Sequence, residues 1–130
     1  MWNPKVLTAD EIGRITWAIQ EVLKRGKPIA EVSSLRTKKK ADLIDDLENC
    51  IKLMRCKGKV FFWVENAKCP KWKGMYRYRY GFYTYPCILR AFKHMDSAKI
   101  NPVLRDVFLG LLFGYRPEII QEFVSKQKRR

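Results

Sequence analysis

The sequence predicts an α+β protein in which about five helices pack with one small antiparallel β-hairpin, as a single basic globular domain over residues 1–130. Apolar residues at helical spacing predict the helices, and two aromatic-rich runs near the middle predict the strands. The chain has 130 residues, of which 47% are hydrophobic, so it can bury one core without disulfides or a structural metal.

Two helices are expected in the first part of the chain, over about residues 9–25 and 38–55, because apolar residues recur there every three or four positions. Thr8 and Glu11 form a capping box at the start of the first helix. The connector between the two helices is expected to be irregular, with one short helical turn at residues 29–32.

The hairpin is expected in the middle of the chain. The run Val60–Val64 is aromatic and β-branched, which is typical of a strand, and residues 66–74 contain the proline and glycine of a loop. Residues 75–80 alternate strictly, so a strand there would carry three tyrosines on one face and two arginines on the other. The pattern leaves open whether the tyrosines are core or exposed.

Three further helices are expected in the last part of the chain. They begin at Pro86, at Pro102 and at Pro117, and Asn101 is placed to cap the second of them. Residues 126–130 are expected to form a frayed basic tail.

The charge of the chain is large and uneven. The net charge is +14, but residues 1–50 carry nine basic and eight acidic residues. Residues 51–85 carry nine basic residues and one acid, and residues 86–130 carry nine and four. A concentrated basic field attracts phosphate backbones, so the composition predicts binding to a polyanion, with nucleic acid, DNA or RNA, as the expected partner. The alternative is that the charge serves solubility alone.

The segment 68–85 interleaves cations with aromatic residues. Cations neutralise phosphates while aromatic faces stack on bases, a combination typical of single-strand binding with little sequence specificity. The alternative is that these aromatic residues form ordinary hairpin core. The predicted nucleic-acid-binding residues are Lys38, Lys39, Lys40, Lys57, Lys59, Lys68, Lys71, Trp72, Lys73, Arg77 and Arg79.

The stretch Lys40-Ala41-Asp42-Leu43-Ile44 resembles the second helix of SAP-type and Rho-N-type DNA-binding modules, with residues 18–51 corresponding to their helix–loop–helix. The resemblance implies phosphate contacts by the lysines at 38–40. The connector between the helices is longer here than in those modules.

The C-terminal segment 108–123 resembles segments of some small bacteriophage-encoded proteins. This resemblance implies a competing function, an inhibitor or regulator that binds a host nucleoprotein, of the anti-defence or anti-CRISPR kind. Such a protein would work in the host cytoplasm.

The sequence does not predict an enzyme, a cofactor or a metal site. His94 is the single histidine, and neither a nucleophile elbow nor a glycine-rich phosphate loop is present. The four cysteines lack the close spacing of a zinc site and are expected to be thiols in a reducing compartment, the cytoplasm or, if the host has one, the nucleus. Glu65, Asp96 and Asp106 would have to converge to form a catalytic carboxylate cluster. No apolar run is long enough to span a bilayer, so no membrane partner is expected.

Overall fold

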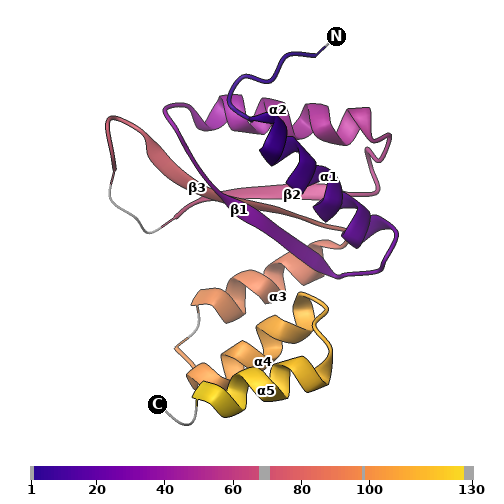
Figure 1. Ribbon diagram of the computed structural model, residues 1–130, viewed down its shortest axis with the longest axis vertical. Helices are drawn as coiled ribbons and strands as arrows, with labels where there is room; N and C mark the ends of the chain where they lie inside the picture. The colour runs from indigo at the N-terminus through magenta and orange to yellow at the C-terminus, as the bar shows by residue number, and fades with distance from the viewer. Residues whose placement is uncertain (1, 68–70, 98, 128–130) are drawn as a thin grey trace.

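The computed structural model describes residues 2–67, 71–97 and 99–127. Within these residues, five helices and three strands follow one another as α1–β1–α2–β2–β3–α3–α4–α5 (Figure 1). The bounds are α1 Ala9–Leu23, β1 Ile29–Thr37, α2 Lys40–Leu53, β2 Phe61–Asn66, β3 Tyr76–Tyr83, α3 Pro86–Ser97, α4 Pro102–Leu112 and α5 Pro117–Gln127. The α+β class and the five helices are confirmed, but the sheet is larger than the predicted hairpin.

The described strands form one antiparallel sheet in the order β1–β3–β2, with β3 in the centre. At one end of the sheet Phe61 of β2 and Ile29 of β1 both pair with Tyr83 of β3. At the other end Thr37 of β1 pairs with Tyr76 of β3. The predicted hairpin contained only β2 and β3, and β1 is the third strand of the sheet.

The expectation of a helical turn at residues 29–32 was wrong, because this segment is the start of β1. The register of β1 shifts between Glu31 and Ser34, so the apolar residues of the strand do not keep one period of two. Strand β1 pairs with β3, and α2 and β2 lie between these two strands in the chain. The sequence next to β1 therefore contains no hairpin turn that would indicate a strand.

Helices cover both faces of the sheet (Figure 1): α1 and α2 lie on one face, α3 lies on the other, and α4 and α5 lie beyond α3. Tyr78, Tyr80 and Phe82 of β3 are buried in the core under α1 and α2. Tyr78 and Tyr80 are therefore core residues and cannot stack on bases. Only exposed aromatic residues could do so.

The opposite face of the sheet holds a smaller core. Trp63 of β2 packs against Phe92 of α3 with ring centroids 5.2 Å apart, and Ile29 of β1 lies in the same cluster. Gly81 of β3 makes this packing possible, since a Cβ at this position would overlap the Trp63 ring and the carbonyl oxygen of Ala30.

Two polar arrangements fix the ends of helices. The predicted capping box is present: the Glu11 amide donates to Thr8 Oγ1 (3.2 Å), and the Thr8 amide donates to the Glu11 carboxylate (2.9 Å). At α4, the Val103 amide donates to Asn101 Oδ1 (2.9 Å), as predicted. Helix α5 continues to Gln127, so the first two residues of the predicted tail are helical, and residues 128–130 lie outside the described part.

In the described part of the chain, no helix combines the length and apolar character needed to cross a bilayer.

Candidate nucleic-acid interface

The hairpin between β2 and β3 ends in a tight two-residue turn. The Trp72 amide donates to the Met75 carbonyl (3.1 Å), and the Met75 amide donates to the Trp72 carbonyl (2.9 Å). The central residues, Lys73 and Gly74, have φ values of 49° and 76°, as in a type I′ turn. Such turns favour Asn-Gly or Asp-Gly, and a lysine in the left-handed region costs about 1 kcal/mol. The turn therefore holds an ammonium group at the end of the hairpin at a cost in backbone strain.

A second basic segment lies beside this turn, although it is distant in sequence. Arg36 of β1 pairs with Arg77 of β3, and the chain then passes through three lysines at 38–40 as it enters α2. The two segments lie side by side at the same end of the sheet (Figure 1).

We call this region the basic tip and define it as residues 36–40 and 71–77. It contains seven basic residues and no acidic residue. Its cations are Arg36, Lys38, Lys39, Lys40, Lys71, Lys73 and Arg77. Since unlike charges are absent from both segments, the tip concentrates positive potential at one end of the molecule.

Two exposed aromatic residues lie among these cations. Trp72 is 53% exposed and Tyr76 is 45% exposed. Lys73 Nζ lies 4.5 Å from the ring centroid of Trp72, the Arg36 guanidinium lies 5.9 Å from it, and Lys71 Nζ lies 5.0 Å from the ring of Tyr76. Flat rings and cations are thus interleaved in space as well as in sequence.

Helix α2 also points its N-terminus at the basic tip. Lys39 occupies the N-cap position and no side chain caps the helix there. The first turn of a helix carries partial positive charge, so lysines at this place oppose the helix dipole unless an anion binds.

Arg79, a predicted phosphate contact, is engaged elsewhere. Its guanidinium pairs with Glu31 of β1 (2.6 Å), Asp96 of α3 (2.8 Å) and Glu65 of β2 (3.4 Å). The hydrogen bonds to Glu31 and, more weakly, to Asp96 raise the pKa of Arg79, against a lowering by partial burial. Glu65 and Asp96 do meet here, but around a guanidinium, and no group of metal-binding side chains occurs among the described residues.

The predicted site residues are divided by the structure. Lys57 and Lys59 lie in the turn between α2 and β2, at the opposite end of the sheet, roughly 20 Å from the tip at about 3.3 Å per strand residue. Lys68 lies outside the described residues. The basic tip brings together the other predicted residues, Lys38, Lys39, Lys40, Lys71, Trp72, Lys73 and Arg77. Sequence reasoning did not select Arg36 because its place depends on the unpredicted strand β1.

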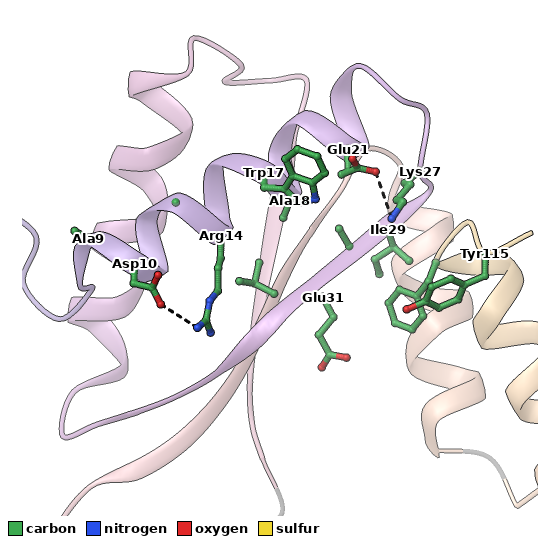
Figure 2. A pocket seen from close by; sticks show the side chains of 14 residues that line it. Ala9, Asp10, Arg14, Trp17, Ala18, Glu21, Lys27, Ile29, Glu31 and Tyr115 are labelled. Carbon is green, nitrogen blue, oxygen red and sulfur yellow. Dashed lines mark hydrogen bonds and ion pairs between the residues drawn. The ribbon is translucent and has the colours of Figure 1, made fainter. Parts of the chain in front are cut away.

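A separate groove of about 590 Å³ lies between α1 and the outer edge of β1 (Figure 2). Its charges are largely paired with one another: Arg14 with Asp10 (2.9 Å) and Lys27 with Glu21 (3.3 Å). Trp17 projects into the groove from α1. Tyr115, in the connection between α4 and α5, also lines the groove. The balanced charge makes this groove unsuited to a polyanion.

No known protein family, curated protein or solved structure matches this chain. The resemblance to SAP-type and Rho-N-type modules concerned two helices joined by a loop, whereas strand β1 lies between α1 and α2. The case for a function therefore depends on the geometry and charge of the molecule itself.

Proposed function

We propose that this protein is a nucleic-acid-binding protein, without enzymatic activity, that holds its ligand at the basic tip. The observation that carries the proposal is the convergence of two acid-free basic segments, 36–40 and 71–77, around two exposed aromatic rings. Cations at this density bind phosphates by counterion release, and exposed rings add base stacking of about 1–3 kcal/mol each.

The form of the tip favours single-stranded nucleic acid and little sequence specificity. Stacking on Trp72 or Tyr76 requires an unpaired base, and every base offers a flat face. Five of the seven cations are lysines, which act as point charges toward phosphate and do not read base edges in the bidentate way of arginine. Such a protein would work in the cytoplasm, where the thiols of Cys50, Cys56 and Cys87 stay reduced.

The strained turn offers a sharp test. Lys73→Asn places a residue favoured in type I′ turns at the first central position, so we expect stability to rise by about 0.5–1 kcal/mol. The same change removes one phosphate contact, so affinity for a fluorescein-labelled oligonucleotide at 0.15 M salt should fall roughly fourfold. A loss of binding in a more stable protein cannot be attributed to unfolding.

Trp72→Ala extends the test to stacking. We expect an affinity loss of about 5-fold or more, measured by fluorescence anisotropy, because one stack contributes at least about 1 kcal/mol. Lys126→Gln on α5 is the matched control, since it removes one charge far from the tip. Equal affinity of Trp72→Ala, Lys73→Asn and the control would show that the tip is not the binding site.

A second candidate function is binding to a protein, as an inhibitor or regulator of a host nucleoprotein. The groove beside β1 favours it, because it combines the outer edge of a sheet with two exposed aromatic residues, Trp17 (56%) and Tyr115 (55%). A strand edge and aromatic anchors are common features of surfaces that bind extended peptides.

A pull-down after nuclease treatment separates the two functions. One stoichiometric protein that survives nuclease and is lost in Trp17→Ala would support the second function. Nucleic-acid binding would be supported if nuclease treatment removed every partner and if Trp17→Ala captured the same partners as the unaltered chain before that treatment.

A further inference from the structure

A second basic cluster lies at the end of the sheet opposite the basic tip. Residues 52–59 contain four basic residues and no acid: Lys52, Arg55, Lys57 and Lys59. All four are exposed, on the last turn of α2 and the turn into β2. Within the described chain, two residues other than glycine have positive φ, and one lies in each cluster, Arg55 (55°) here and Lys73 (49°) at the tip. Arg55 occupies the position after α2 where glycine is usual, so here too a cation is held at a cost in backbone strain.

This cluster borders a groove of about 520 Å³ between α2 and β2. Ile51, Val60 and Phe62 contribute apolar surface. The charged residues of the lining are two lysines, Lys52 and Lys57, and one acid, Glu48. We call this the α2–β2 groove. Its volume lies within the range of sites that bind small molecules.

Two aromatic rings form one wall of the α2–β2 groove. Phe61 is 39% exposed, and its ring centroid lies 5.8 Å from that of Tyr83, with the rings tilted by 32°. Both residues line the groove. A concave surface lined by apolar side chains, two flat rings and two ammonium groups suits a ligand with a planar aromatic part and an anionic part.

Acidic residues separate this groove from the basic tip. Helix α2 joins the two ends of the sheet, and between Lys40 and Lys52 it carries four acids and no further cation. Glu65 lies between them along β2. Asp46 is buried, but a phosphate chain laid along α2 would meet the carboxylates of Asp42, Asp45 and Glu48. The groove is therefore a separate site and not an extension of the tip.

We infer, relying on the proposed function for the class of ligand, that the α2–β2 groove binds a nucleoside monophosphate. The base would lie against Phe61 and Tyr83, and the phosphate would lie between Lys52 and Lys57. A free nucleotide and the 5′-phosphorylated end of a nucleic-acid strand share this chemistry.

The test is an NMR titration of the ¹⁵N-labelled full chain with AMP, adenosine and inorganic phosphate in turn. AMP should shift the amides of Gly58, Phe61 and Tyr83 with saturation. Adenosine and phosphate should each bind at least about fivefold more weakly, because a lost charge contact or a lost stack amounts to at least about 1 kcal/mol. A 5′-phosphorylated oligonucleotide that shifts these amides when AMP does not would identify a strand end as the source of the ligand. Absence of saturable shifts with both would overturn the inference.

Two variants separate this site from the basic tip. Phe61→Leu keeps the apolar volume but removes the ring, and Lys57→Gln removes one charge; each should weaken AMP binding at least fivefold. Lys73→Asn should leave the AMP titration unchanged, whatever its effect on oligonucleotides, so failure of the groove and failure of the tip give different results. Equal AMP affinity in Phe61→Leu, Lys57→Gln and the unaltered chain would contradict the inference.

Discussion

At the scale of single residues, the buried carboxylate of Asp46 ties the N-terminal segment to α2. The Lys5 amide donates to both of its oxygens (2.9 and 3.0 Å), and the amides of Val6 (2.8 Å) and Leu7 (3.1 Å) donate to Oδ2. A carboxylate suits three converging donors because it has two acceptor oxygens and no proton to donate. The three backbone amides therefore depend on a single side chain.

We expect Asp46→Asn to lower the free energy of unfolding by about 2–3 kcal/mol, because the new NH₂ group faces backbone donors and leaves a buried amide unpaired. Urea denaturation followed by circular dichroism measures the change. Asp45→Asn is the matched control, since Asp45 makes only an exposed ion pair with Lys5 and should leave stability nearly unchanged. Equal losses in the two variants would contradict the role given to Asp46.

Burial also sets the reactivity expected of the thiols. Burial, and secondarily the charge of Asp46, raises the pKa of Cys50 to about 11 from an ordinary value of 9.0. Burial also raises the pKa of Cys56, whereas Cys87 is exposed. Since the thiolate is the reactive form, Cys50 and Cys56 should resist alkylation in the folded protein.

We expect iodoacetamide at pH 8 to modify Cys87 at least tenfold faster than Cys50 or Cys56, as measured by peptide mass spectrometry. In urea all three should react at similar rates. Because the pKa of Cys50 is higher in the folded state, its contribution to stability is complete below pH 9 and is lost between about pH 9 and 11. Cys50→Ala should remove this part of the alkaline loss.

At the scale of elements, sequence pattern predicted all five helices to within a few residues but only two of the three described strands. Capping residues and prolines mark helix ends locally, so α1 and α4 could be predicted from a few neighbouring residues. Strand β1 could not, because a bulge interrupts its alternation and its pairing depends on β3, distant in the chain. Predicting it requires knowing the tertiary structure.

The packing of β3 against β2 depends on one glycine. We expect Gly81→Ala to reduce the free energy of unfolding by about 2–3 kcal/mol, because the added methyl would overlap the Trp63 ring and the Ala30 carbonyl. Gly13→Ala on α1 is the matched control. Nothing lies within 4 Å of a Cβ at Gly13, and alanine favours a helix, so stability should rise by about 0.5–1 kcal/mol. Thermal unfolding of both variants measures these changes, and changes of the same sign would contradict the packing described.

At the scale of the whole molecule, the charge of sequence segments predicted the grouping of the basic residues better than individual residues did. The acid-free runs at 38–40 and 71–73 could be selected from the sequence, and the fold brings them together. Arg79 looked equivalent to Arg77, but its three carboxylate partners come from β1, β2 and α3, and only the fold brings them to it. The local sequence pattern identifies basic residues but does not show which acidic residues pair with them.

Under the proposed function, the seven cations of the basic tip set a limit on the salt dependence of nucleic-acid binding. For a single-stranded oligonucleotide, log K plotted against log salt should have a slope between about −3 and −5, at about −0.7 for each phosphate contact. Lys71→Gln should reduce the slope by about 0.7 and Lys126→Gln should leave it unchanged, as measured by anisotropy from 0.05 to 0.3 M salt. A slope near zero would exclude electrostatic binding.

The central position of β3 has a consequence for the order of folding. Both other described strands pair with β3 and not with each other, and β3 comes last of the three in the chain. During synthesis, α1 and α2 can form early, but no strand can pair until β3 has left the ribosome. The apolar faces of the first half of the chain then stay exposed until one late step closes the sheet, and this interval is when the protein is most open to aggregation.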